Sequence, residues 1–145
     1  MKGKGLWTVF FGLYCALMLW LLFDRAGYIE GIPYEDQLKM NLLPFQTIRL
    51  FLRLLNHPVF RKDAVINLFG NIIMFIPLGF LLPKIFPRLN KFHKVLLTAG
   101  IIITVVELTQ LLTLLGSCDT DDLILNVLGA TIGYGFYKVT NKPAP

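Results

Sequence analysis

The chain has 145 residues and a formal net charge of +5 at pH 7. Hydrophobic residues make up 55% of it and charged residues only 16%, with a mean hydropathy of +0.63, whereas soluble domains are usually about one quarter charged. This composition excludes an ordinary soluble domain and predicts a single integral membrane domain over residues 1–145. No basic stretch with interleaved aromatic residues occurs, so we expect no nucleic-acid partner.

Four apolar stretches are long enough to cross a hydrocarbon core, which needs about 20 helical residues. They cover residues 6–23, 65–82, 95–115 and 123–139. The predicted fold class is therefore all-α, with a four-helix transmembrane bundle. The first stretch is longer than the apolar core of a secretory signal and lacks a small-residue cleavage site, so we expect a retained anchor.

The connection between the first two spans contains a predicted amphipathic helix over residues 46–56. Arg49 and Arg53 share one face, opposite an apolar face. The apolar face consists of Ile48, Phe51, Leu52 and Leu55. Three placements stay open: flat in the membrane interface with both arginines contacting lipid phosphates, packed over the mouth of the bundle, or re-entrant.

The distribution of Lys and Arg predicts that both termini lie in the cytoplasm. Eight basic residues fall in the N-terminal tail, the second connection and the C-terminal tail, and none falls in the third connection. The long first connection holds six, on the opposite side of the membrane.

Polar and small residues recur at helical spacing in three spans. The stripes are Asp63, Asn67, Gly70 and Asn71; Thr104, Glu107 and Gln110; and Asp122, Asn126, Gly129 and Gly133. Such stripes face other helices in membranes, and span count and direction place all three in one leaflet. We therefore expect a shared cleft opening toward the outer surface. Its predicted ligand-binding residues are Asn67, Asn71, Glu107, Gln110, Asp119, Asp122 and Asn126.

Each polar group also has a structural explanation. The amide side chains are suited to interhelical hydrogen bonds, and Gly129 and Gly133 to helix packing, either within the chain or in a homodimer. Capping of the last span explains its aspartates, Asp121 above all. Glu107 differs, because a buried carboxyl group without a strong partner is a candidate catalytic acid or base, or a hydrogen-bond donor to a substrate.

Carboxylate and amide oxygens are the ligands that Mg²⁺ or Ca²⁺ would require. The candidate ligands are Glu107, Asp119 and Asp122. Zinc is not indicated, because His57 and His93 lie in connections on opposite sides of the membrane and Cys118 is isolated. A serine nucleophile is unsupported, since Ser117 is the only serine in the chain and its only same-side histidine is His57.

Four motifs in series resemble the VanZ-like family of bacterial membrane proteins. They are Asn41-Leu-Leu-Pro44-Phe45, the run from Asn67-Leu-Phe-Gly-Asn71 to Pro83, Glu107-Leu-Thr-Gln110, and Asp119-Thr-Asp121-Asp122 with Asn126-Val-Leu-Gly129. The resemblance covers residues 41–133. Many relatives carry an Arg just before the acidic motif, where this chain has Gly116-Ser117-Cys118.

The resemblance implies a multi-pass protein of the bacterial cytoplasmic membrane, in a family associated with resistance to teicoplanin and lipoglycopeptide antibiotics. These drugs act on lipid-linked cell-wall precursor at the outer face. We therefore expect the protein to recognise or alter a cell-envelope lipid or lipid-linked precursor at the outer leaflet and so reduce glycopeptide access. The alternatives are a metal-assisted hydrolase or transferase acting on a lipid phosphate and, third, a small transporter.

Overall fold

The computed structural model describes residues 4–23, 40–115 and 117–141. These residues are mostly helical, as predicted. The helices are α1 (Lys4–Phe23), α3 (Gln46–Leu54), α4 (Arg61–Ile85), α5 (Phe92–Leu112) and α6 (Thr120–Thr140), with a 3₁₀ turn at Pro87–Leu89.

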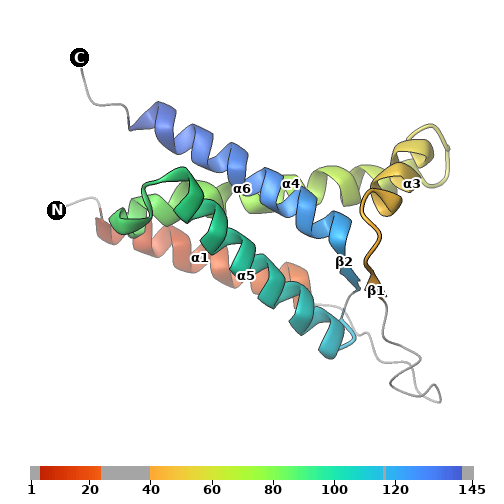
Figure 1. The fold of residues 1–145 in the computed structure, drawn as a ribbon, viewed down its shortest axis with the longest axis horizontal. Coiled ribbons are helices and arrows are strands. Elements are labelled where there is room, and N and C mark those ends of the chain that lie inside the picture. Colours follow the sequence, from red (N-terminus) through yellow and green to blue (C-terminus); the bar gives the residue numbers. More distant parts are fainter. Residues whose placement is uncertain (1–3, 24–39, 116, 142–145) are drawn as a thin grey trace.

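The four long helices lie side by side and alternate in direction along the chain, while the short α3 lies at one end of the bundle (Figure 1). The starts of α4 and α6 and the end of α5 lie toward the α3 end. The start of α1 and the end of α6 lie at the other end. This alternation brings polar stripes from three different helices toward the same end of the molecule.

Helix α4 is the centre of the bundle, because it contacts α1, α3, α5 and α6. Its closest approach is to α6, where glycines face backbone carbonyl groups. A Cβ atom added at Gly129 would lie 2.1 Å from the carbonyl oxygen of Ile72, and one at Gly133 would lie 1.9 Å from that of Ile76. The glycine pair of α6 therefore serves packing within the chain; the formation of a homodimer stays a prediction.

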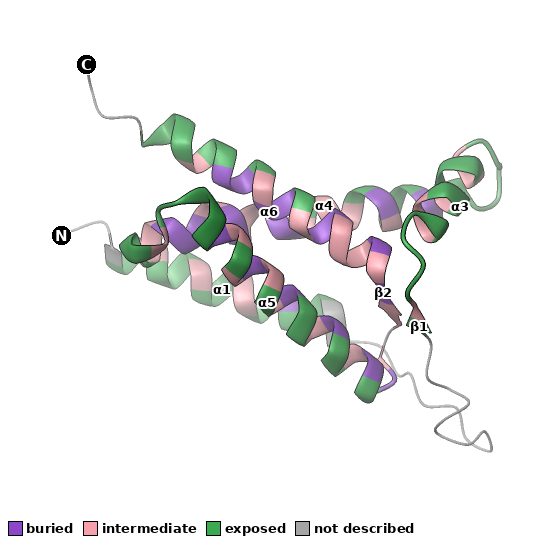
Figure 2. Ribbon diagram, viewed as in Figure 1, coloured by how far each residue is buried: buried purple, intermediate pink, exposed green. Residues whose placement is uncertain are grey.

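Large apolar side chains cover the outside of the bundle. Leu13 on α1 and Leu97 on α5 are exposed examples, and Figure 2 shows exposed residues along the outer helix faces and buried residues between the helices. Helices α4 and α5 are long and apolar enough to cross a membrane, and α1 contains the shorter apolar segment Gly5–Leu21. This surface suits contact with lipid.

The third predicted span ends earlier than expected, at Leu112 rather than at residue 115. The N–H of Leu115 donates to the carbonyl of Gln110 (3.0 Å), and that of Leu114 donates to the carbonyl of Leu111 (3.2 Å). This is the Schellman pattern of helix termination. Leu114 adopts φ 59°, a left-handed conformation usually taken by glycine, so its side chain gave no sign of a helix end.

A short strand pair is absent from the all-α prediction. Strand β1 (Met40–Asn41) pairs in parallel with β2 (Cys118–Asp119), and Asn41 lies opposite Asp119. This pairing joins the segment before α3 to the segment before α6. It therefore sets the N-termini of these two helices beside each other, although about 75 residues separate them in sequence.

Candidate functional site

Asp119 caps α6 and also holds the segment around α3. Its Oδ1 accepts a hydrogen bond from the N–H of Asp121 (2.8 Å). Its Oδ2 accepts from the Thr47 hydroxyl (2.6 Å) and from Asn41 Nδ2 (3.3 Å). The carboxylate thus ties the start of α6 to β1 and to the first turn of α3.

Asp121 caps a different helix from the one expected. Its carboxylate accepts from the backbone N–H groups of Phe45 and Ile48 at the start of α3, the latter at 2.9 Å. Phe45 has φ 67°, and the Asp121 side chain is fully buried. The prediction that Asp121 caps its own helix was wrong, because the strand pair brings the free amides of α3 within its reach. We call Asp119, Asp121 and their hydrogen-bond partners the latch.

A polar cleft of about 510 Å³ lies between α4, α5 and the start of α6. The apolar residues that line it include Phe51 from α3 and Leu21 from α1. Its polar lining consists of Asp63, Asn67, Asn71, Glu107, Gln110, Ser117, Asp122 and Asn126. The structure therefore brings together six of the seven predicted ligand-binding residues. The seventh, Asp119, belongs to the latch.

Two polar lining residues were not among the predicted ligand-binding residues. Asp63 lies four residues before Asn67, on the same helical stripe, so its spacing was a usable signal. Ser117 lies in the connection between α5 and β2, where no periodicity indicates which way a side chain faces.

The hydrogen bonds inside the cleft do not satisfy all of its acceptor atoms. Asn71 Nδ2 donates to Asp122 Oδ1 (2.6 Å), and Asn126 Nδ2 donates to Glu107 Oε1 at a long 3.4 Å. Within the described part of the chain, three buried side-chain atoms find no hydrogen-bond partner: Asn67 Oδ1, Glu107 Oε2 and Asn126 Oδ1. Glu107 is 6% exposed and Asn126 3% exposed. A buried polar atom without a partner costs about 1–3 kcal/mol.

The candidate metal ligands are not gathered. Among residues 4–23, 40–115 and 117–141, no group of three or more His, Cys, Asp or Glu side chains is placed to hold a metal ion. Asp119 hydrogen-bonds to Thr47 and Asn41 in the latch, while Glu107 and Asp122 line the cleft. The arrangement therefore gives no support to a Mg²⁺ or Ca²⁺ site built from Glu107, Asp119 and Asp122.

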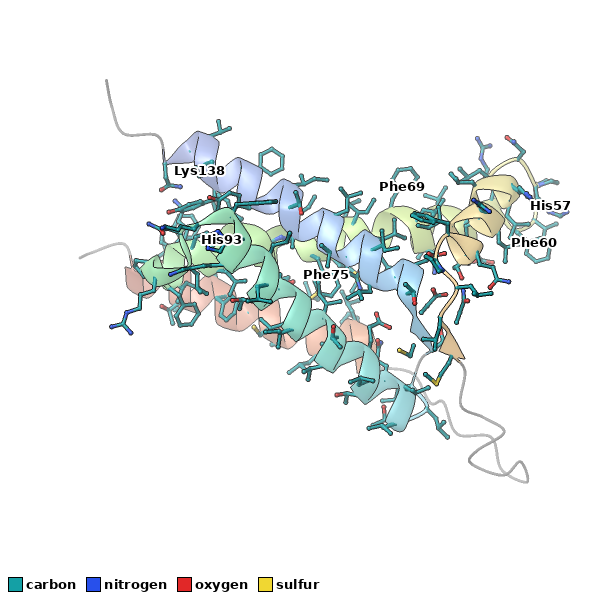
Figure 3. All side chains as sticks on the ribbon, viewed as in Figure 1. His57, Phe60, Phe69, Phe75, His93 and Lys138 are labelled. Atoms are coloured by element: carbon teal, nitrogen blue, oxygen red, sulfur yellow. The ribbon has the colours of Figure 1, made fainter. Side chains whose placement is uncertain are left out.

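Neither the histidines nor Cys118 are among the residues that line the cleft. His57 and His93 lie at opposite ends of the molecule (Figure 3), and neither lines the cleft. Cys118, in β2, is a free cysteine. Burial raises the pKa of its thiol, and the carboxylates of Glu107 and Asp119 raise it further. A thiol with a raised pKa is a poor nucleophile at neutral pH.

Arg49 and Arg53 line a second hollow, an open groove of about 610 Å³ along α3 and the segment before it. Gln46, Thr47 and Asn41 add polar groups to this groove. Both arginines are exposed. The predicted polar face of α3 therefore lies at the surface, whereas Ile48, Phe51 and Leu55 on the predicted apolar face are partly buried. Leu52, expected on the apolar face, is 52% exposed.

The comparisons with known proteins agree on a family. The family model for VanZ/LLP1 matches residues 11–141, a longer stretch than the motifs of residues 41–133. A protein from Enterococcus faecium described as "Protein VanZ" is 27% identical over 141 residues, covering 97% of this chain and 78% of the relative. No solved structure matches the chain. The length and position of the family match show that the chain belongs to the VanZ/LLP1 family of membrane proteins.

Proposed function

We propose that this protein binds a cell-envelope lipid or lipid-linked precursor in the polar cleft and thereby reduces the access of teicoplanin-type glycopeptides to the outer leaflet. The observation that carries the proposal is the set of unpartnered acceptors on Asn67, Glu107 and Asn126. The family's association with teicoplanin resistance supplies the antibiotic part of the proposal.

Helix packing alone accounts poorly for the cleft. If its polar residues served only to join helices, their donors and acceptors would be satisfied by one another. Instead, Glu107 keeps one carboxylate oxygen without a partner, and its single bond from Asn126 is long. An incomplete polar network that recurs on three helices is typical of a site that a ligand completes.

The proposed orientation places the cleft in the outer half of the membrane. In a four-span arrangement of α1, α4, α5 and α6, the cleft lies toward the end where α3 lies. His93 and Lys138 lie at the other end of the molecule (Figure 3). The last turn of α4, which contains Lys84, and the first turn of α5, which contains Lys94, lie at that end too. With these basic residues in the cytoplasm, the cleft faces outward and the arginine groove of α3 lies at the level of lipid phosphates.

The proposal of a metal-assisted hydrolase or transferase has less support, because the three candidate ligand carboxylates are not placed to hold one metal ion together. Glu107 stays a candidate catalytic acid or base, since it is buried and lines the cleft. Substitution of Glu107 by Gln distinguishes the two proposals. Turnover by this carboxyl group would be abolished, whereas binding would only be weakened.

Native mass spectrometry of the detergent-purified protein tests lipid binding. We expect the wild type to retain a bound lipid at clearly higher occupancy than Glu107→Gln and Asp122→Asn. Thr109→Val is the matched control, because its hydroxyl bonds to Val105 of its own helix (2.7 Å) and does not line the cleft. Teicoplanin susceptibility of cells expressing the same set tests the link to resistance. Identical lipid spectra for all four proteins would overturn the proposal.

A further inference from the structure

We infer that the cleft takes the protonated primary amine of its ligand, while the ligand's phosphate stays outside it. The inference rests on the proposed lipid-binding function and names the chemical group that this site recognises.

The first reason is hydrogen bonding. The three unpartnered atoms in the cleft, on Asn67, Glu107 and Asn126, are all oxygens that accept hydrogen bonds. They lie on three different helices, α4, α5 and α6. An ammonium group carries three N–H donors and no acceptor, whereas an ionised phosphate offers acceptors only. Donors on the ligand would complete this network, and phosphate oxygens would leave it incomplete.

The second reason is charge. Three carboxyl side chains line the cleft, on Asp63, Glu107 and Asp122, and none of the described residues that line it is Lys or Arg. Asn71 donates to one oxygen of Asp122 and so fixes that carboxylate in place. A carboxylate at membrane depth is costly without an opposite charge. A bound ammonium group supplies that charge, and a phosphate would add repulsion.

Other donors fit less well. Neutral sugar hydroxyls would satisfy the free oxygens but would leave the carboxylates without a counter-charge. A divalent cation takes six or more oxygen ligands, and the described Asp and Glu side chains are not gathered for this purpose. Arg49 and Arg53 line the α3 groove at this end of the molecule, and their guanidinium groups would favour an anion there. Separate acidic and basic surfaces suit a headgroup that carries both charges.

The test compares two lipids that differ only at the amine. Binding of didecanoyl phosphatidylethanolamine and of its N-acetyl derivative to the full chain in detergent is measured by native mass spectrometry titration. N-acetylation removes the charge and leaves one N–H donor. We expect it to weaken binding about tenfold or more, the scale expected for losing hydrogen bonds to a charged group. Because both titrations use the wild-type protein, the result does not depend on a variant that folds.

Variants then assign the effect to the cleft. Glu107→Gln should reduce the difference between the two lipids, whereas Thr109→Val should preserve it. Equal binding of the two lipids by the wild type would overturn the amine assignment and leave lipid binding standing. Stronger binding of didecanoyl phosphatidylglycerol, which has no amine, would do the same.

Two further outcomes separate the inference from the proposed function. Absence of binding for every lipid would overturn both. Phosphoethanolamine, which has the amine and phosphate but no acyl chains, is added as a competitor. Competition as strong as that of the lipid would support amine recognition and overturn the assignment of the ligand as a lipid.

Discussion

The latch and the cleft draw on the same short stretch of sequence but differ in how their polar groups are satisfied. Asp119 and Asp121 accept hydrogen bonds from Asn41, Thr47 and the start of α3. Asp122 follows directly and lines the cleft, where Glu107 and Asn126 keep unpartnered oxygens. One acidic motif therefore serves two purposes: two carboxylates hold the architecture together, and the third faces the proposed ligand.

This difference predicts opposite responses to substitution. Removing a satisfied carboxylate leaves its buried partners without an acceptor and destabilises the fold. Removing an unsatisfied group relieves a cost that the folded protein already bears, so stability is kept or increased while ligand binding is lost.

The largest effect on stability is expected from Asp121→Ala. The Asp121 side chain is fully buried, and its removal leaves the N–H groups of Phe45 and Ile48 without an acceptor. The expected loss in the free energy of unfolding is about 2–4 kcal/mol. The apparent melting temperature in detergent measures this loss, and protease cleavage within α3 reports its detachment. Asp121→Asn, which keeps one acceptor oxygen, should fall between Ala and the wild type. A melting temperature unchanged in the Ala variant would contradict the latch.

The opposite response is expected from Asn126→Leu. Asn126 is 3% exposed, its Oδ1 is unpartnered and its Nδ2 makes one long bond to Glu107 (3.4 Å). Removal of the unpartnered oxygen should offset the loss of that bond, so an apolar residue of similar size should change stability by less than about 1 kcal/mol. Lipid retention should fall about tenfold or more. Thermal unfolding and native mass spectrometry on the same sample measure both quantities. A destabilised variant that retained its lipid would place Asn126 among the structural residues.

A smaller loss is expected from Thr47→Val, which nearly preserves shape but removes the hydroxyl that donates to Asp119 Oδ2 and accepts from Asn41 Nδ2 (2.8 Å). The expected cost is about 1–2 kcal/mol, the usual contribution of a hydrogen bond to a charged group. Thr104→Val is the matched control, because that hydroxyl bonds only to Gly100 of its own helix. Equal melting temperatures for the two variants would show that Thr47 contributes nothing to the latch.

The smallest effect concerns the reactivity of Cys118, which lies beside both regions. Its pKa is raised, first by burial and then by the carboxylates of Glu107 and Asp119, so the thiolate is scarce at pH 7 and alkylation should be slow. The rate should increase as pH rises, and Glu107→Gln should increase it modestly by removing a negative charge. Maleimide labelling in a Cys15→Ala background measures the rate. Fast labelling at pH 7 that does not change with pH would contradict the raised pKa.

Helical spacing was enough to predict most of the cleft. Asn67, Asn71, Glu107 and Asn126 recur at intervals that fix one face of each helix, and the alternation of the spans brings those faces to the same end. The latch could not be predicted in this way. The partners of Asp121 are backbone amides 73 and 76 residues away, and backbone amides leave no mark in the pattern of side chains.

Backbone conformation set the other limit. Phe45 and Leu114 both adopt positive φ angles, and neither residue type favours this conformation. Phe45 immediately precedes α3, and its N–H donates to the carboxylate of Asp121. Leu114 follows the end of α5, which lies three residues before the predicted boundary. The conformation of Phe45 depends on a tertiary contact, and that of Leu114 depends on the hydrogen bonds of the helix end. Neither can be predicted from hydropathy.

Photocrosslinking of lipid tests most directly whether the ligand occupies the cleft. A photoreactive residue at Ser117, which lines the cleft, is compared with one at Leu97, which is 67% exposed on the outside of α5. We predict a lipid adduct from Ser117 that Glu107→Gln reduces about tenfold and an adduct from Leu97 that Glu107→Gln leaves unchanged. Equal sensitivity at the two positions, or no adduct from Ser117, would contradict a lipid site in the cleft.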